Sequence, residues 1–342
     1  MSHKPLREDS MHPTQPTRRH LLNTGLGLGL AGLVPLTARA DDKYPSRPIT
    51  FVVPFPPGGS VDIMARQYSE PLSRVLGVPI VVENRAGAGG SVASQMVARA
   101  KSDGYTLVVS SQSSHLANPL TQSKVGYDPI KDFENIAILG RQPNVLVVHS
   151  SLPIKTFKEF LDYARKNPGK LNYGSGGVGS MGQLNVEMLK AATGVFTTHI
   201  PYRGGTPLIT AVLANEVQFT LDNLVTMLPH IQTGKVRALA VAADQRLPQL
   251  SDVPTLAEVG YPQLNLTSWT GLAAPGGTSD AIVQTLHKAV RQVATSPAML
   301  ASLKDRGVIA PEEMTPAAFE KMMSERLAKF GDVVRKAGIT AE

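Results

Sequence analysis

The sequence contains no cysteine. Disulfide bonds, thiol nucleophiles and thiolate metal ligands are therefore excluded. A chain without cross-links depends on its hydrophobic core for stability. Hydrophobic residues make up 42% of this chain, and a length of about 300 residues after removal of a leader is enough for two globular domains.

The sequence after residue 40 also lacks two features that would indicate other partners. It has no apolar run long enough to span a bilayer, so we expect a soluble mature protein. It has no stripe of lysine and arginine interleaved with aromatic residues, so we expect no nucleic-acid partner. The formal charge of +7 overstates the basic character, because residues 1–40 hold five basic and two acidic residues and their removal leaves +4.

Residues 1–40 have the three parts of an export signal. A polar, basic start is followed by the apolar segment 25–36 and by Ala38-Arg39-Ala40, which is typical of a cleavage site. Arg18 and Arg19, followed by two leucines, resemble the twin-arginine signal of bacteria. A nucleic-acid-binding patch is the competing interpretation of these arginines, but the apolar segment behind them disfavours it. We therefore predict a cleaved leader and a periplasmic location.

A glycine loop follows the first predicted strand. The β-branched run 49–54 is followed by Phe-Pro-Pro-Gly-Gly-Ser-Val-Asp at 55–62, and a helical pattern begins near Ile63. Glycines allow close approach of the backbone to a ligand, and the amides and dipole of a helix N-terminus favour an anion. The alternative is an ordinary turn, with Ser60 or Asp62 as the helix cap.

Strands and helices then alternate, and two more glycine loops, 87–91 and 174–180, also open helices. This alternation predicts parallel-rich sheets with a ligand crevice at the carboxyl ends of the strands. Extended runs at 136–139 and 144–149 lead out of the first series, 237–242 is predicted as a return strand, and 279–341 is almost wholly helical. We expect a clamshell with lobe I at 41–142 and 240–342, lobe II at 143–239, and the crossing strands as the hinge.

Eight segments carry a resemblance to a known family. They are YPSRPI (44–49), VPFPPGG (53–59), VENRAGAGG (82–90), DGYTL (103–107), YGSG (173–176), IPYRG (200–204), RALAV (237–241) and VPTLAE (253–258). In these segments the chain resembles the Bug receptors, the periplasmic solute-binding proteins of tripartite tricarboxylate transporters. They occur in the family's order over nearly the whole mature chain.

The resemblance implies a type II periplasmic binding protein fold, α/β with two lobes that close on one small organic carboxylate. It implies that backbone amides and water hold the carboxylate, that no cofactor or metal is needed, and that membrane permease subunits receive the ligand. We expect a monomer with no enzymatic activity. Because family members also deliver ligands to membrane sensor proteins, a signalling role is an alternative.

The predicted ligand-binding residues come from loops of both lobes. They are Pro57, Gly58, Gly59, Ser60, Asp62, Ser111, Ser113, Gly176, Gly177, Ser180, Arg203, Gly204, Asp222 and Asn223.

Several of these residues have an alternative structural role. By resemblance, an acidic residue at Asp222 is associated with recognition of a ligand amine; it could instead cap the helix from Leu224. Arg203 could bind a second carboxylate bidentately or could be solvated. Trp269 matches an aromatic residue common in the family near the hinge, and we predict that it belongs to the core.

A secreted serine hydrolase is the competing function. Ser180 is followed by Gly182, and Asp222 and then His230 or His287 preserve the hydrolase chain order. However, Val178 stands where the first glycine of the nucleophile motif belongs. The histidines are scattered without an i,i+4 pair, so the sequence predicts no metal site.

Overall fold

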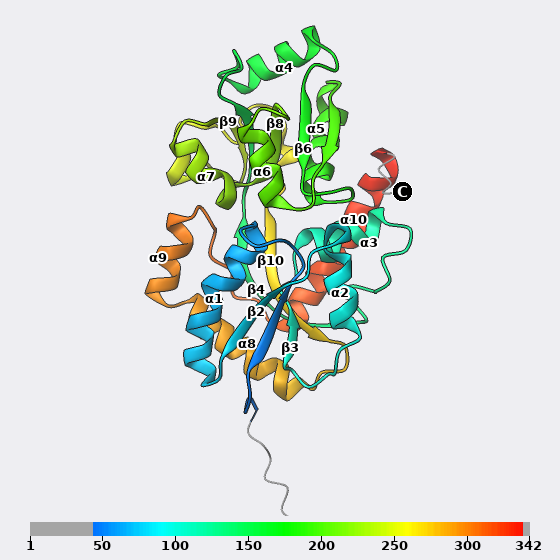
Figure 1. The fold of residues 1–342 in the computed structure, drawn as a ribbon, viewed down its shortest axis with the longest axis vertical. Helices are drawn as coiled ribbons and strands as arrows, with labels where there is room; N and C mark the ends of the chain where they lie inside the picture. Colours follow the sequence, from blue (N-terminus) through cyan, green and yellow to red (C-terminus); the bar gives the residue numbers. More distant parts are fainter. Residues whose placement is uncertain (1–43, 338–342) are drawn as a thin grey trace, which may run out of the picture. The chain divides into compact units, whose positions relative to one another are not determined.

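The structure, a computed structural model, describes residues 44–337, so the predicted export signal lies outside the described residues. The described chain forms two five-stranded sheets, each covered by helices (Figure 1). No helix in this range has both the length and the apolarity needed to cross a membrane.

The first sheet has the strand order β2-β1-β3-β10-β4. Its strands are β1 (Ile49–Val53), β2 (Ile80–Asn84), β3 (Thr106–Val108), β4 (Phe133–Gln142) and β10 (Ser268–Pro275). Strand β1 is parallel to β2 and β3, whereas β10 is antiparallel to β3 and β4. The sheet is therefore mixed, with yellow β10 lying between strands that come from the first half of the chain (Figure 1).

Helices from both ends of the chain cover this sheet. They are α1 (Ser60–Leu76), α2 (Ser91–Ala98), α3 (Asn118–Thr121), α8 (Asp280–Ala294), α9 (Pro297–Asp305) and α10 (Pro316–Ala337). The apolar residues of α1 recur at helical spacing, and Met64, Tyr68 and Leu72 are buried against the sheet. The helix ends at Gly77, whose left-handed conformation favours glycine.

The second sheet repeats the arrangement, with the order β7-β6-β8-β5-β9. Its strands are β5 (Asn144–His149), β6 (Asn172–Ser175), β7 (Thr198–Pro201), β8 (Phe219–Asn223) and β9 (Val236–Ala242). The hydrophobic clusters place α4 (Phe157–Lys166) and α5 (Met181–Thr193) on one face, and α6 (Gly205–Leu213) and α7 (Leu224–Gln232) on the other. Strand β6 is parallel to β7 and β8, whereas β5 is antiparallel to β8 and β9.

Two chain segments connect the sheets. Strand β4 leads into β5 through Pro143, and residues 243–267 lead from β9 to β10. The Asn144 side chain ties these crossings together, because its Nδ2 donates to the Leu266 carbonyl at 2.7 Å and to Ser268 Oγ at 3.1 Å. The crossing segments therefore form one hydrogen-bonded hinge.

The predicted lobe boundary between residues 239 and 240 requires correction. It cuts through β9, in which Ala240 and Val241 pair with β5 of the second sheet. Leu256 and Leu264 then pack in the core of the same lobe. The chain returns to the first sheet only at β10, which the sequence did not reveal because Gly271, two alanines and a proline have little strand propensity.

Candidate functional site

A cavity of about 60 Å³ lies between the two lobes; we call it the inner chamber. Both glycine loops contribute to its wall. It is lined by Phe55, Gly59, Ser60, Val61, Ser111, Gln112, Ser113, Gln142, Gly176, Ser180, Met181, Gly182, Gly204, Gly205, Asp222, Asn223, Thr226, Ser268 and Trp269.

Four helices present their N-termini to the inner chamber. Helices α1, α5, α6 and α7 begin at Ser60, Met181, Gly205 and Leu224, and first-turn or cap residues of each line the wall. The first amides of a helix have no partner within the helix, and the helix dipole adds partial positive charge at the same end. Their convergence makes the chamber suited to an anionic group.

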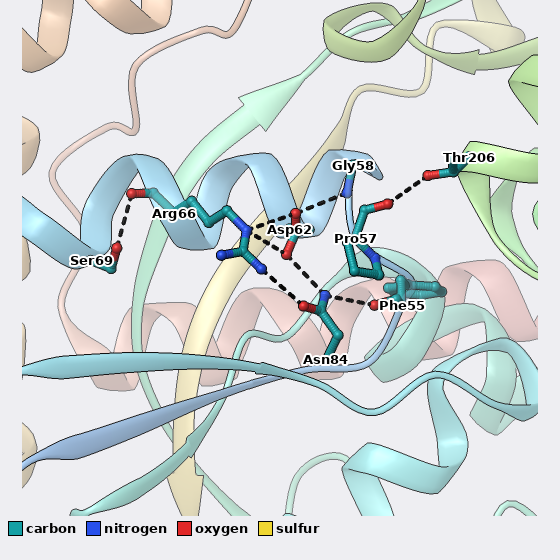
Figure 2. Close-up of polar contacts among 8 residues, drawn as sticks. All are labelled: Phe55, Pro57, Gly58, Asp62, Arg66, Ser69, Asn84 and Thr206. Carbon is teal, nitrogen blue, oxygen red and sulfur yellow. Dashed lines mark hydrogen bonds and ion pairs between the residues drawn. The ribbon is translucent and has the colours of Figure 1, made fainter.

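The loop before α1 is held in shape by Asp62 (Figure 2). One carboxylate oxygen of Asp62 accepts the Gly58 amide at 2.9 Å, and the other accepts Asn84 Nδ2 at 2.9 Å. Arg66 Nε donates to both oxygens at 3.0 Å. Asn84 Nδ2 also donates to the Phe55 carbonyl at 2.9 Å, so the network spans the loop from its first residue to the helix.

Asp62 is consequently a support of the loop and does not line the inner chamber, contrary to its predicted ligand contact. Its carboxylate is buried with 3% of the residue exposed. Burial alone would raise the pKa of Asp62, but the hydrogen bonds from Arg66, Gly58 and Asn84 and the charge of Arg66 lower it below its usual value. A group with a lowered native pKa stabilises the fold above its ordinary pKa.

We expect Asp62→Asn to reduce the free energy of unfolding by about 2 kcal/mol at pH 7, because it loses charged hydrogen bonds. This deficit should shrink as the pH falls from 3.8, the ordinary pKa, through the lowered native pKa. Urea denaturation between pH 7 and pH 3 measures both effects. Asp162→Asn is the control, since it removes an exposed i,i+4 pair with Lys158 and should leave the free energy of unfolding nearly unchanged. Equal losses in the two variants would contradict the supporting role.

The loop of the second lobe is held by a serine and a histidine. Ser175 Oγ donates to the Gly177 carbonyl at 3.0 Å and shares a hydrogen bond of 2.6 Å with His199 Nε2. Burial, with a smaller contribution from Lys190, lowers the pKa of His199 to about 4 against the opposing charge of Glu187. The ring is therefore neutral at pH 7. Together these contacts fix the glycine loop that leads into α5.

The lobes touch across the inner chamber, so the structure is a closed form. Thr206 Oγ1 of lobe II donates to the Pro57 carbonyl of lobe I at 2.7 Å (Figure 2). The Met181 amide donates to Ser113 Oγ at 3.2 Å. Gly204 approaches Pro56 so closely that a Cβ on Gly204 would lie 2.5 Å from the proline Cδ.

Several polar groups of residues that line the chamber have no partner in the described part of the chain. Among the residues that the structure describes, both side-chain polar atoms of Gln112, Gln142 Nε2, Asn223 Oδ1 and Trp269 Nε1 are buried without a hydrogen bond. Buried polar groups are normally satisfied, so unsatisfied groups around one cavity indicate a bound molecule or water. Of these residues, the sequence had predicted a ligand contact only for Asn223.

Asp222 lies on the same wall. Burial raises its pKa, although the hydrogen bonds from the Asn223 backbone and side chain to Oδ1 act in the opposite direction. Asn223 is the residue before α7, and no side-chain hydrogen bond caps that helix. The alternative role of Asp222 as a helix cap is therefore not what the structure shows.

Nine of the fourteen predicted residues line the inner chamber: Gly59, Ser60, Ser111, Ser113, Gly176, Ser180, Gly204, Asp222 and Asn223. Five do not. Asp62 is one of them. Gly58 and Pro57 are two more: the Gly58 amide donates to Asp62, and the Pro57 carbonyl accepts from Thr206. Gly177 and Arg203 line a neighbouring outer cavity, which shares Phe55, Gly176 and Gly204 with the inner chamber.

The outer cavity has a volume of about 740 Å³ and is lined in part by the loop 87–90. Glycines in that loop allow close packing: a Cβ at Gly89 would lie 2.9 Å from Asn118 Oδ1, and one at Gly90 would lie 3.1 Å from Phe55. The packing role of these glycines is therefore visible directly. Arg203 is exposed and lines the outer cavity, and it is not among the residues that line the inner chamber.

The serine hydrolase arrangement is absent from residues 44–337. Ser180 Oγ accepts the Gln183 amide at 3.4 Å as the cap of α5, and no histidine in this range hydrogen-bonds it. His287 bonds the Ile136 carbonyl in the other lobe. The position of the serine is explained by capping.

Comparisons with known proteins identify the family. The sequence profile of the family described as tripartite tricarboxylate transporter family receptor matches residues 64–339. Protein BugT of Bordetella pertussis is 34% identical over 322 residues, which cover 94% of this chain and 98% of BugT.

Two solved structures show the same fold. Rpa4515 of R. palustris, solved with adipate, is 35% identical with a TM-score of 0.84, over 87% of this chain and 99% of that one. MatC from Rhodopseudomonas palustris, solved with bound malate, is 35% identical with a TM-score of 0.81, over 85% of this chain and 100% of MatC. These relatives confirm the resemblance found in the sequence. The chain belongs to the receptor family of the tripartite tricarboxylate transporters. These receptors are solute-binding proteins and not enzymes.

Proposed function

We propose that this receptor captures a small organic carboxylate in the inner chamber and delivers it to the membrane permease subunits of a tripartite transporter. The convergence of four helix N-termini on one small cavity carries the proposal. The relatives solved with adipate and malate support the same ligand class. Residues 1–40 would direct the chain to the periplasm, where it acts as a monomer.

The chamber suggests how the two ends of the ligand are distinguished. The carboxylate lies against the amides at the start of α1 and the Gly182 amide at the start of α5, with Ser60 and Ser180 beside it. Asp222 lies beside the start of α5, where a Cβ on Gly182 would be 3.4 Å from its Oδ2, and it repels a second carboxylate. A ligand that carries a hydrogen-bond donor, hydroxyl or ammonium, next to its carboxylate fits this chamber best.

Lobe closure completes the site. The contacts Thr206–Pro57 and Met181–Ser113 form only when the lobes meet. A ligand that bridges the lobes shifts the population toward this closed form. The hinge formed by the two crossing segments allows the movement.

A thermal-shift screen of residues 41–342 tests the ligand class. The panel contains hydroxy acids, amino acids, unsubstituted dicarboxylates, tricarboxylates, aromatic acids and neutral analogues. A matching acid at about 100 times its dissociation constant should stabilise the protein by about 2.7 kcal/mol. The uncharged amide of the best acid is the control and should give little shift. If neutral compounds stabilised the protein and no acid did, the carboxylate proposal would be wrong.

A further inference from the structure

A separate cavity of about 220 Å³ lies at the hinge. We call it the hinge pocket. It is formed by Arg141 at the end of β4, Thr267 and Trp269 at the second crossing, Glu312, and α10 residues that include Arg326. Trp269 lines both this pocket and the inner chamber, so the two cavities share one wall.

The charges in the hinge pocket do not balance. Arg141 pairs with Glu312 at 3.0 Å, and the Glu312 side chain is 72% exposed. Within residues 44–337 the half-buried Arg326 side chain makes no hydrogen bond or ion pair. Two guanidinium groups therefore face one carboxylate, and that carboxylate points largely into solvent.

An unpaired, partly buried guanidinium is unfavourable. Burial, followed by the nearby charge of Arg141, lowers the pKa of Arg326. A structural arginine in such a place normally finds a carboxylate or carbonyl groups for its five donors. Trp269 forms the wall shared with the inner chamber, so the unpaired donor among the described residues that belongs to the hinge pocket is Arg326. The pocket is large enough to hold water or a small solute.

We propose that the hinge pocket binds a small oxyanion, held by the Arg326 guanidinium with Arg141 beside it. Inorganic sulfate, phosphate and small carboxylates share the required chemistry, because a planar guanidinium binds two oxygens of such groups in parallel. The rest of the wall is apolar and is formed by Met314, Met322 and Ile138. The pocket therefore has room for a small oxyanion but offers no further cationic partner to a larger anion.

The position of the pocket couples it to the lobes. Arg141 immediately precedes Gln142 in the inner chamber and Pro143 at the crossing, and its backbone is bonded in both directions to Ile309 at 2.9 Å. An anion that draws Arg141 and Arg326 together would fix the end of β4 against the C-terminal segment. By linkage, the anion and the transported ligand then alter each other's affinity by the same factor.

Trp269 fluorescence tests the proposal directly, since this residue is the sole tryptophan. Purified residues 41–342 are titrated with sulfate, phosphate or acetate, with sodium chloride keeping the ionic strength constant. We expect a saturable change in emission with at least one of these anions. Arg326→Met, which matches the neighbouring methionines, should lower the affinity for that anion by about tenfold or more. This is the effect expected for loss of a bidentate charged contact. Arg335→Gln, an exposed arginine on the same helix, should leave the titration unchanged.

Two further measurements distinguish the possible outcomes. In anion-free buffer, Arg326→Met should unfold at the same temperature as the parent or higher, which separates loss of binding from misfolding. Arg141→Gln by itself should also lower the affinity for the anion. Gly204→Ala, which affects the inner chamber, should keep a saturable anion response, with the affinity changed only by the factor that links lobe closure to the hinge pocket. A linear response without saturation, or a response kept in Arg326→Met but lost in Gly204→Ala, would overturn the proposal. This test does not require the identity of the transported ligand, so it can fail without affecting the proposed function.

Discussion

Replacement of Gly204 with alanine should weaken ligand binding about 100-fold, which corresponds to about 2.7 kcal/mol. In the closed form the new Cβ would lie 2.5 Å from Pro56 Cδ and 2.8 Å from Pro56 Cγ, across the boundary between the lobes. Proline is rigid, so the overlap is relieved only by separating the lobes. The positive φ of 106° at Gly204 adds backbone strain. The variant should therefore remain folded with its lobes apart.

Calorimetry measures the affinity, and small-angle scattering with and without ligand measures lobe closure. The matched control is Gly194→Ala at the end of α5, where φ is +69° but a Cβ would meet no atom within 4 Å. This control carries the strain of a positive φ without the overlap, so it should lower stability and preserve affinity. If Gly204→Ala compacted on ligand addition and bound as tightly as the parent, Pro56 would not be the closing contact.

Asp222→Asn should stabilise the free protein at neutral pH. Burial raises the native pKa of Asp222 above its unfolded value. The native state therefore holds a proton more tightly than the unfolded state, and stability falls as the pH rises from the ordinary carboxyl pKa through the raised one. Asparagine has no charge to bury, and its Oδ1 can still accept the Asn223 amide. Urea denaturation at several pH values from 4 to 8 should show this slope in the parent and its loss in the variant.

The same substitution should change ligand preference. A ligand with a hydroxyl or ammonium group next to its carboxylate should lose about 10- to 100-fold in affinity, because a hydrogen bond to a charged acceptor becomes a neutral one. An unsubstituted dicarboxylate should bind more tightly once the like charge is removed. Asp252→Asn, at an exposed position, is the control for both experiments. Unchanged stability and preference in Asp222→Asn would show that Asp222 faces water and not ligand.

Local signals in the sequence were sufficient for most of the secondary structure. The β-branched runs at β1 and β5 and the helical pattern of α1 lie where they were predicted, because each element reflects the periodicity of its own residues. The glycine loops before α1 and α5 were recognised for the same reason. β10 was missed because a small-residue strand buried on both faces carries no alternating pattern.

Sequence alone also determined the family, since the eight motifs carry it in order. It did not determine which loop residues face the chamber. Asp62 was predicted at the site from its place in the loop, but its direction was decided by Arg66 one turn later and by Asn84 on the next strand. Arg203 adjoins the loop that opens α6 but lines the outer cavity.

Only the tertiary structure brought together Gln112, Gln142, Asp222 and Trp269, from four separate segments of the chain. Asp222 was predicted from the family resemblance, but Gln112, Gln142 and Trp269 share no local pattern with it, so no sequence signal could group the four. Their proximity results from the packing of β4, β8 and β10 at the hinge, and such long-range pairing is set by the whole buried core and not by any one segment. The sequence therefore determined the receptor family and predicted an anion-binding cradle of glycine loops, whereas only the fold showed which side chains line the chamber beside those loops.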